Sequence, residues 1–365
     1  MAKIFLITAA RPNFMKVAPL FHALKKERWA EPQIIHTGQH YDIGMSDFFF
    51  EDLLLPPPHI NLGIGSGTHA EQTGNVMIAF ERFVSKERPD LVVVVGDVNS
   101  TMACTIAAVK LGCKVAHLEA GLRSFDRNMP EEINRVVTDA LSDILWTPSP
   151  DADQNLLNEG IKPEKIKRVG NIMIDSLELL RKKIEKESML EEFRLDAGNY
   201  AVVTLHRPVN VDTRDSLNKI CDALEFIASK CKVVFPVHPR TKKNLETFGL
   251  HSRLDMNEHL IMIDPLSYVK FMNLVFSSKF LITDSGGIQE ETTYLGIPCL
   301  TLRENTERPI TVSMGTNRLC SIENIQSRVD EVFQRNFTTG SIPKLWDGHT
   351  AERVVKDIDK RFGYS

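Results

Sequence analysis

The chain has 365 residues, of which 42% are hydrophobic and 25% are charged, a composition typical of a globular protein. At roughly 150 residues per domain, this length favours two domains. The formal net charge of -4 provides no overall attraction for a polyanion, so we expect no nucleic-acid partner.

The first residues do not have the pattern of a secretory signal, because Pro12 interrupts a short apolar run where such a signal would continue. No run of about 18 apolar residues is present, so we expect a cytoplasmic protein with no membrane association. The six cysteines are scattered and form no CxxC pair. This favours buried free thiols in a reducing compartment over disulfides or a zinc site.

Short β-branched runs alternate with helical patterns in the first half of the chain. The runs are KIFLIT (3–8), LVVVVG (91–96) and KVAHL (114–118), and a helical pattern follows each of them. LVVVV is apolar at every position, which is typical of a parallel strand buried on both faces. This alternation predicts βαβ units and an open parallel sheet.

A long, charged and helical segment at 173–195 has no strand pattern beside it. The strand–helix alternation then resumes with YAVVTLH, KVVFPVH, HLIMID, KFLITD and IPCLTL. We therefore predict an α/β protein with two Rossmann-like doubly wound parallel-sheet domains, at 1–172 and 196–345, that face a cleft. The segment 173–195 would connect them, and an amphipathic pattern predicts a last helix at about 350–365.

Unusual side chains follow six of the predicted strands, at their carboxyl ends, where doubly wound sheets bind their ligands. These segments are AARPN (9–13), GDVNS (96–100), EAGLR (119–123), HR (206–207), HPR (238–240) and DSGG (284–287). The sequence therefore predicts a ligand site that both domains contribute to.

The DSGG segment stands before a helical pattern whose first turns contain Glu290 and Glu291. Glycines let a backbone approach a ligand, and the first N–H groups of a helix bind phosphate, so Ser285 and the glycines are candidates for a phosphate site. A capped helix after a glycine turn is the alternative. Glu291 has the chemistry to accept hydrogen bonds from a ribose diol, and together these features indicate a nucleoside diphosphate. Candidates for its counter-charge are Arg11, Lys16, Arg207, Arg303 and Arg308.

Carboxylates at the strand ends of the first domain are candidates for acid/base chemistry. Asp97 and Glu119 follow strands, and Glu131 and Glu132 open a helix after Pro130. With His206 they form a possible acid/base set. Alternatively, Asp97 caps a helix or lies in a turn, and the two adjacent glutamates are an ordinary helix start. No GxGxxG and no GxxxxGK[ST] occurs, so neither NAD nor ATP is expected in its usual site.

Longer motifs resemble those of the non-hydrolysing UDP-N-acetylglucosamine 2-epimerase family, and they cover nearly the whole chain in order. They are ARPNFMKVAPL near the start, HTGQHYD (36–42), HLEAGLRS (117–124), MPEEINR (129–135), TDSGGIQEE (283–291) and RENTERP (303–309). The resemblance implies the glycosyltransferase-B architecture, with a C-terminal helix that packs back on the first domain. It also implies a homodimer.

The resemblance further implies a reaction: UDP-N-acetylglucosamine and UDP-N-acetylmannosamine interconvert by elimination and re-addition of UDP, without cofactor or metal, for surface polysaccharide synthesis. Asp97, Glu119 and Glu131 match the catalytic carboxylates of the family, and His206 matches its active-site histidine. The expected UDP-sugar-binding residues are Arg11, Lys16, Arg207, Phe271, Ser285, Gly286, Gly287, Glu291 and Arg308.

The chain departs from the family pattern at two places. Asn13 stands where a glutamate is usual, and HRPVN (206–210) replaces the usual HRREN. Bacterial members bind a second substrate molecule as an activator, and Gln39, Arg207 and His238 match parts of that region. Because the loop is altered here, we expect weak or absent activation.

The substrate has alternatives. HTGQHYD, GTHAEQTG (67–74) and MPEEINR also resemble relatives that act on a C3-acetamido uronic-acid analogue of the same nucleotide sugar. A hydrolysing 2-epimerase or a glycosyltransferase is a further alternative on the same fold. A non-catalytic sensor of UDP-sugars would not need several acid/base candidates at strand ends.

Overall fold

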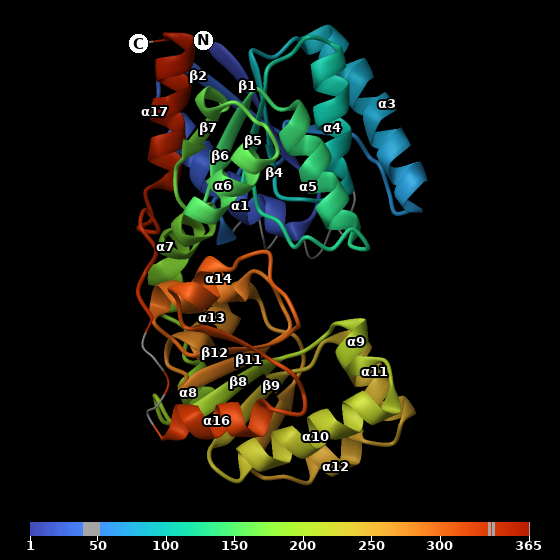
Figure 1. The fold of residues 1–365 in the computed structure, drawn as a ribbon, viewed down its shortest axis with the longest axis vertical. Helices are drawn as coiled ribbons and strands as arrows, with labels where there is room; N and C mark the ends of the chain where they lie inside the picture. The colour runs from blue at the N-terminus through green and yellow to red at the C-terminus, as the bar shows by residue number, and fades with distance from the viewer. Residues whose placement is uncertain (39–51, 335–336, 338–339, 365) are drawn as a thin grey trace. The chain divides into compact units, whose positions relative to one another are not determined.

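A computed structural model describes residues 1–38, 52–334, 337 and 340–364, and for Arg11 it describes the backbone alone. Gln39 lies outside the described residues. The chain forms two compact units, which we call the N-terminal unit (1–180 and 344–365) and the C-terminal unit (181–343) (Figure 1). Each contains a parallel sheet with helices on both faces, so the predicted α/β class with two doubly wound sheets is confirmed.

None of the helices in the described ranges combines the length and the apolar character that a membrane crossing needs. The six cysteines are free thiols, as the sequence predicted. Five of them are buried, whereas Cys113 is partly exposed.

The sheet of the N-terminal unit has the strand order β3-β2-β1-β4-β5-β6-β7, and all its pairs are parallel. The strands are β1 (Ala2–Thr8), β2 (Ala30–His36), β3 (Ile60–Asn61), β4 (Leu91–Val95), β5 (Val115–Leu118), β6 (Ile144–Thr147) and β7 (Ile166–Arg168). Every residue of β4 is buried, as its continuous apolar pattern predicts. The carboxyl ends of these strands therefore share one edge of the sheet.

Helices cover both faces of this sheet. They are α1 (Arg11–Leu24), α3 (His69–Glu87), α4 (Asn99–Lys110), α5 (Pro130–Leu141), α6 (Pro150–Asn158), α7 (Ile172–Ile184) and α17 (Thr350–Phe362). Helices α3 and α4 pack on one face, around Phe5, Phe80 and Val92, whereas α1 and α17 pack together on the other (Figure 1).

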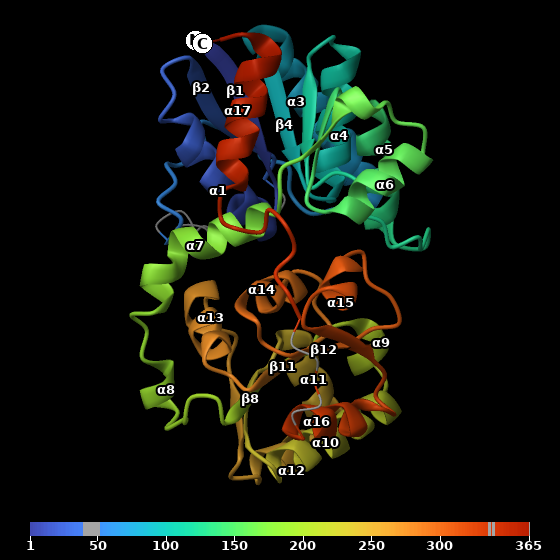
Figure 2. The ribbon, with the colours of Figure 1, turned by 60° about the vertical axis from the view of Figure 1, so that its left-hand side comes forward.

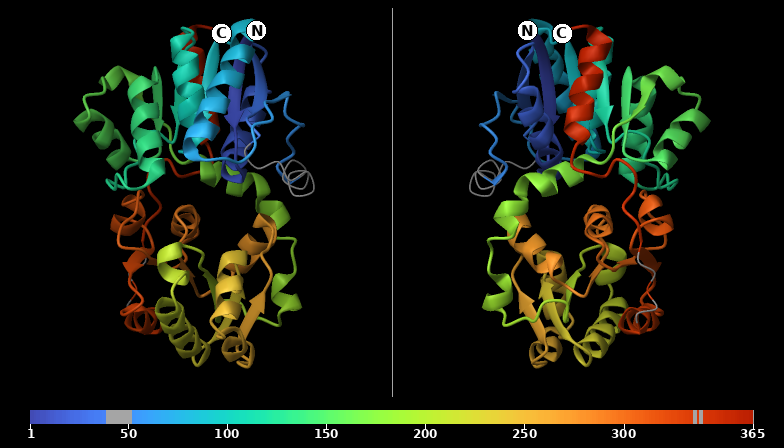
Figure 3. Two further views of the ribbon diagram at one scale, coloured as in Figure 1. Left: turned by 90° about the vertical axis from the view of Figure 1, so that its right-hand side faces the viewer. Right: turned by 90° about the vertical axis from the view of Figure 1, so that its left-hand side faces the viewer.

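The C-terminal helix α17 is fixed to the N-terminal unit by polar and aromatic contacts. The buried carboxylate of Asp175 accepts hydrogen bonds from the N–H groups of Thr350 (3.1 Å) and Ala351 (2.7 Å), at the start of α17. The Trp146 indole donates to Asp357 at 2.8 Å. The two ends of the chain lie close together, where Tyr364 stacks on Trp29 (Figure 3).

The segment 173–195, predicted as a helical connection, contains two helices with a break between them. Helix α7 ends at Ile184, and the short helix α8 (Met189–Glu192) follows. The Asn273 side chain donates to the carbonyl groups of Ile184 (2.9 Å) and Glu187 (3.1 Å) and accepts from the N–H of Met189. Asn273 thus satisfies backbone groups that the helix break leaves without helical partners.

The sheet of the C-terminal unit has the order β10-β9-β8-β11-β12-β13 and is also parallel. Its strands are β8 (Tyr200–Thr204), β9 (Lys232–Pro236), β10 (Leu260–Ile263), β11 (Phe280–Thr283), β12 (Cys299–Leu302) and β13 (Asn317–Cys320). Its helices are α9 (Pro208–Val211), α10 (Arg214–Ala228), α11 (Pro239–Thr247), α12 (His251–Asp255), α13 (Tyr268–Phe276), α14 (Ile288–Leu295), α15 (Ile310–Ser313) and α16 (Ile325–Phe333). Helices α10 and α16 cover one face of the sheet, and α13 and α14 cover the other (Figure 2).

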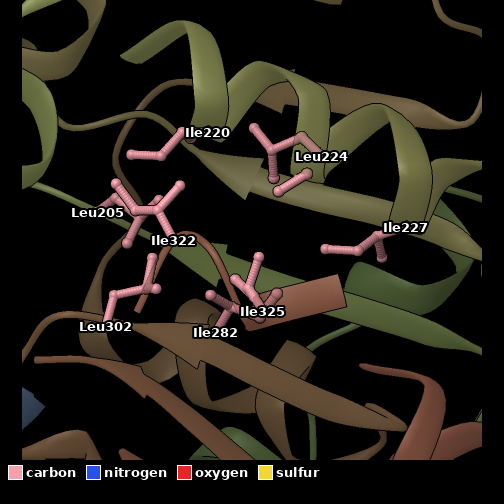
Figure 4. A pocket seen from close by; sticks show the side chains of 9 residues that line it. Leu205, Ile220, Leu224, Ile227, Ile282, Leu302, Ile322 and Ile325 are labelled. Atoms are coloured by element: carbon pink, nitrogen blue, oxygen red, sulfur yellow. The ribbon is translucent and has the colours of Figure 1, made fainter. Parts of the chain in front are cut away.

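A small void lies in the apolar core between the sheet and helices α10 and α16 (Figure 4). Its lining residues are Leu205, Ile220, Ala223, Leu224, Ile227, Ile282, Leu302, Ile322 and Ile325. Its volume of about 10 Å³ is too small for a ligand, and an apolar void of this kind stays dry. We interpret it as a packing defect rather than a binding site.

The void leads to a stability prediction for Leu224, which is 2% exposed. Leu224→Ala should lower the free energy of unfolding of the C-terminal unit by about 2–5 kcal/mol, because it enlarges a cavity that cannot fill with water. Native-state hydrogen exchange of the β8 amides measures this unit separately. Leu157→Ala, at a 43% exposed position of α6, is the control and should change little. Equal exchange rates in wild type and Leu224→Ala would contradict the prediction.

Candidate active site

The predicted residues of the N-terminal unit gather at the carboxyl edge of its sheet. Asp97 follows β4 and Glu119 follows β5, while Lys16 lies in α1 and Glu131 lies in the first turn of α5. Because the strands are parallel, the segments after β1, β4 and β5 are neighbours at this edge. Arg11 begins α1 at the same edge.

Lys16 and Glu119 form a buried ion pair through Nζ and Oε2, and their side chains are 9% and 4% exposed. The second oxygen of Glu119, Oε1, is buried and has no hydrogen-bond partner in the described part of the chain. The Glu119 backbone has a φ of +75°, a left-handed conformation that is unfavourable for a residue with a side chain. A strained backbone therefore holds a carboxylate with one oxygen paired and one oxygen available.

The turn after β4 brings backbone against this ion pair. Gly96 has a φ of +66°, and a Cβ atom at this position would lie 2.9 Å from Lys16 Nζ. Asn13, one of the departures from the family pattern, supports the same turn. Its Nδ2 donates to the carbonyl of Val95 at 3.0 Å, and its Oδ1 accepts from the N–H of Ala10 at 2.9 Å.

Asp97 is held by α5. Its carboxylate pairs with Arg135, and its carbonyl accepts from Asn134 Nδ2 at 2.9 Å. The N-cap of α4 is Val98, so the alternative that Asp97 caps this helix is wrong. Glu131 is exposed on the first turn of α5.

Glu132 has a structural role. Its buried carboxylate accepts from Ser124 N–H (2.9 Å) and from Phe125 N–H (3.0 Å), and it pairs with Arg135 at 3.0 Å. Glu132 therefore fixes the loop between Glu119 and α5, and both of its carboxylate oxygens have hydrogen-bond partners. Of the two adjacent glutamates, only Glu131 remains free for a ligand.

In the C-terminal unit the centre of the arrangement is Asp284, which follows β11 and is fully buried. Its carboxylate accepts from the N–H groups of His206 (3.0 Å) and Arg207 (2.8 Å), from Asn210 Nδ2 (3.0 Å) and from His206 Nδ1 (2.9 Å). Burial alone would raise the pKa of Asp284, but the hydrogen bonds from these residues outweigh burial and lower the pKa. An ionised Asp284 thus orients His206 and leaves its Nε2 for a ligand.

His238 lies beside His206, with ring centroids 5.4 Å apart. Its Nδ1 accepts a hydrogen bond from the N–H of Arg240 at 3.2 Å, at the start of α11. Partial burial, and then the charge of His206, lower the pKa of His238. The two histidines therefore share one edge of the C-terminal sheet.

The glycine pair approaches a cluster of buried ions. Glu307 pairs with Arg303 at 2.8 Å and with Arg308 at 2.6 Å, and Arg308 also pairs with Glu290 at 2.9 Å. A Cβ atom on Gly286 would lie 2.5 Å from Glu307 Oε1 and 3.2 Å from Arg308 Nη1. Within the residues that the structure describes, Arg303 Nε and Nη1 have no hydrogen-bond partner. Two guanidinium groups, of which Arg303 has spare donors, thus lie against the loop that was predicted to bind phosphate.

Helix α14 begins after Gly287, which is its N-cap, so the Ser285 hydroxyl does not cap the helix. Glu291, in the first turn, is buried, and its Oε1 accepts from the Tyr268 hydroxyl at 2.5 Å. Burial raises the pKa of Glu291 to about 7, against the opposing effect of the Tyr268 hydrogen bond. Phe271 lies one turn after Tyr268 on α13 and shares its face of the helix.

The structure thus groups Lys16, Asp97, Glu119 and Glu131 in one unit, and the remaining candidates with described side chains in the other. No role was predicted for Asp284, Tyr268, Arg135 or Glu307. Asp284, Arg135 and Glu307 stand inside the quoted motifs, so a signal was present. Glu307 pairs with its sequence neighbours Arg303 and Arg308, whereas the donors to Asp284 are 74 to 78 residues away, and nothing in a single sequence identifies them.

Comparison with known proteins gives a consistent result. A sequence model of the family described as UDP-N-acetylglucosamine 2-epimerase matches residues 22–359. UDP-N-acetylglucosamine 2-epimerase of Methanocaldococcus jannaschii is 46% identical over 361 residues, 97% of this chain and 98% of that protein. UDP-2,3-diacetamido-2,3-dideoxy-D-glucuronate 2-epimerase of Pseudomonas aeruginosa is 41% identical over 320 residues, 87% of this chain and 88% of that protein.

A solved structure is also similar. The crystal structure of Methanocaldococcus jannaschii UDP-GlcNAc 2-epimerase in complex with UDP-GlcNAc and UDP superposes with a TM-score of 0.86 at 43% identity. The match covers 98% of this chain and 99% of that one. The similarity therefore includes both units and nearly all of their elements.

The ion cluster around Glu307 leads to a prediction about stability and pH. Burial alone would raise the pKa of Glu307, but the charges of Arg308 and Arg303 outweigh it and lower the pKa. Glu307→Gln should therefore lower the free energy of unfolding of the C-terminal unit by about 3–5 kcal/mol near pH 7, because it leaves two buried guanidinium groups short of an anion.

The sign of the pH dependence follows from the lowered pKa. The stabilisation by Glu307 is complete above the ordinary carboxyl pKa of about 4.3 and is lost as the pH falls further. The difference in free energy of unfolding between wild type and Glu307→Gln should therefore become smaller in acid. Native-state hydrogen exchange of the β11 and β12 amides measures it. Glu304→Gln, at an exposed position of the same loop, is the control. A difference in free energy of unfolding that becomes larger in acid would refute the lowered pKa of Glu307.

Proposed function

The chain belongs to the UDP-N-acetylglucosamine 2-epimerase family, and from this premise we propose that it inverts C2 of UDP-N-acetylglucosamine to give UDP-N-acetylmannosamine, reversibly. The observation that carries the proposal is the buried Lys16–Glu119 pair with its unpartnered Glu119 Oε1. A carboxylate oxygen without a partner is a natural acceptor for a proton. The reaction also requires a site that holds UDP, and we assign this site to the loop of Ser285, Gly286 and Gly287 before α14.

The chemistry explains why both features are needed. The C2 proton of the sugar is weakly acidic, because no carbonyl group stands on a neighbouring ring carbon. In the proposed reaction the C2–H bond and the C1–O bond to UDP break, and a C1–C2 double bond forms. UDP then adds back to C1 while a proton is delivered to the other face of C2. Atoms and electrons balance without a redox step, so the mechanism needs no cofactor and no metal.

We assign the proton transfers to the N-terminal unit. Glu119, with Oε2 held by Lys16, takes or returns one proton, and Asp97 and the exposed Glu131 are the groups available for the opposite face. Arg135 orients Asp97. This assignment is supported by the common sheet edge of the three carboxylates and by their match to the family motifs.

We assign the retention of UDP to the C-terminal unit. Ser285, Gly286 and Gly287 would receive the diphosphate, with Arg308 as its cation and with Arg11 and Arg207 as further candidates. Glu291 would accept the ribose hydroxyls, and Phe271 would lie by the uracil. His206, oriented by Asp284, would help UDP to depart. The resemblance also favours a homodimer and a role in polysaccharide synthesis.

A second substrate has specific support. The Pseudomonas aeruginosa relative is named for the C3-acetamido glucuronate analogue and is 41% identical. Incubation with each UDP-sugar separately, followed by proton NMR, distinguishes the two substrates. A stable mixture of two UDP-sugars indicates epimerisation, whereas free UDP with free N-acetylmannosamine would indicate a hydrolysing enzyme instead.

The central test of the mechanism is Glu119→Gln. A positioned acid or base contributes about 10²–10⁴-fold, so turnover of UDP-N-acetylglucosamine should fall on this scale. UDP affinity, measured by calorimetry, should change much less than turnover, because most of the proposed UDP groups belong to the other unit. In D2O the wild type should place deuterium at C2 of the product.

Glu81→Gln, at an exposed position of α3 in the same unit, is the matched control and should retain wild-type turnover. Near-normal turnover of Glu119→Gln would remove Glu119 from the proton transfers. Product formed with its C2 hydrogen fully retained would rule out elimination and re-addition.

The assignment of Glu291 to the ribose leads to a pH prediction. Because its pKa is raised to about 7, the carboxyl group is protonated below this pH and then has one acceptor oxygen fewer for the ribose diol. The ratio of the dissociation constants of 2′-deoxy-UDP and UDP should therefore be larger at pH 8 than at pH 6, by roughly tenfold for a hydrogen bond to a charged group. Ionisation of the diphosphate changes both dissociation constants equally, so it does not affect their ratio.

Glu291→Gln serves as the reference for this measurement, since an amide does not titrate and its ratio should be independent of pH. Calorimetry with both nucleotides at several pH values provides the data. If the wild-type ratio stays constant between pH 6 and pH 8, Glu291 does not bind the ribose as an ionised carboxylate.

A further inference from the structure

His117 is fully buried in β5, and the mechanism above does not use it. Its Nδ1 lies 2.6 Å from Asp139 Oδ1, and its Nε2 lies 2.9 Å from the carbonyl oxygen of Gly96. A carbonyl oxygen only accepts hydrogen bonds, so Nε2 must donate to Gly96. The state of Nδ1 depends on Asp139.

Asp139 is also fully buried, in α5, and it is surrounded by donors. Its Oδ2 accepts from the N–H of Gly121 at 3.0 Å and pairs with Arg123 at 2.7 Å. Asp139 therefore binds His117 through one oxygen and Arg123 through the other, and Arg123 in turn pairs with Glu159 at 2.7 Å. These contacts fix the orientation of the ring whose Nε2 donates to Gly96.

The His117 ring joins the segments that carry the catalytic candidates. Gly96 directly precedes Asp97, and Glu119 stands two residues after His117. Strands β4 and β5 are paired, with Val94 opposite His117 in register. On its other side the ring is bound to α5, the helix that carries Glu131 and the Arg135 partner of Asp97.

We propose that His117 is a positioning residue for the epimerase reaction, which holds the Gly96 turn through its Nε2 proton and thereby places Asp97 and the Lys16–Glu119 pair. Gly96 needs such a restraint, because its left-handed turn passes directly beside Lys16 Nζ and Glu119 Oε2. The proposal rests on the proposed function. It concerns the N-terminal unit, whereas most of the proposed UDP groups belong to the C-terminal unit, so it predicts a much larger loss of turnover than of UDP affinity.

Two isosteric substitutions separate the two hydrogen bonds of the ring. The side-chain nitrogen of glutamine is placed like Nε2, so His117→Gln keeps a donor for Gly96. The side-chain nitrogen of asparagine is placed like Nδ1, so His117→Asn keeps a donor for Asp139 and loses the one for Gly96. We expect His117→Asn to lower kcat by about 10²-fold, the scale of a small misplacement of catalytic groups, and His117→Gln to stay within about tenfold of wild type.

The readouts are kcat and KM for UDP-N-acetylglucosamine, deuterium incorporation at C2 in D2O, and UDP affinity by calorimetry. A purely structural role predicts that turnover follows thermal stability in the two variants, with no preference for glutamine. Equal turnover of the two variants, or a more active His117→Asn, would overturn the proposal. Absence of epimerisation by the wild type would instead refute the proposed function.

A measurement on the wild type keeps the proposal testable if the variants do not fold. Protein labelled with ¹⁵N in its 11 histidines should show one ring whose Nε2 carries a proton that is protected from solvent exchange. This Nε2 signal should persist when UDP is added. A spectrum in which no histidine has a protected proton on Nε2 would contradict the assignment of His117 as the donor to Gly96.

Discussion

Charged groups buried at the carboxyl ends of parallel strands must be paired, and this constraint organises both units. An unpaired buried charge costs several kcal/mol, so each buried ion here has a partner of opposite sign or several hydrogen-bond donors. Glu119 has Lys16, and Asp284 has four donors from the segment after β8. Because these partners come from different strand–helix units, the same contacts that neutralise the charges also fix the loops of the candidate site.

The sequence was sufficient for the fold and for the location of the candidate residues, because both are local properties. A continuous apolar run such as β4 indicates a buried parallel strand, and side chains after such strands must lie at one edge of the sheet. The pairing of these side chains is not local. Lys16 and Glu119 are 103 residues apart, and His206 and Asp284 are 78 apart, so only the tertiary structure shows that they meet. The break after Ile184 was missed for the same reason, since Asn273 satisfies it from another helix.

The departures from the family pattern preserve these contacts. Asn13 bonds to the carbonyl of Val95 and to the N–H of Ala10, so it connects the turns after β1 and β4 without adding a charge. In HRPVN, the histidine and the asparagine at the two ends bind Asp284, whereas Pro208 begins α9 and Val209 is 74% exposed. The altered positions thus lie between the contacts with Asp284 and do not interrupt them. We therefore expect the Pro208 and Val209 replacements to leave the position of His206 unchanged, and to affect only ligands that contact the outer surface of this loop.

Strain and charge are concentrated at the same edge of the N-terminal sheet. Glu119 has a left-handed backbone, which costs of order 1–3 kcal/mol for a residue with a side chain, and its carboxylate leaves one buried oxygen without a partner. Neither feature stabilises the folded chain: a glycine would avoid the backbone strain, and any residue without a carboxylate would avoid the unpartnered oxygen. Their persistence is explained if the free oxygen is used by a ligand, because the surrounding pairs hold it in place before the ligand arrives. The residue that carries these two costs is therefore also the best-prepared acceptor for a proton in this unit.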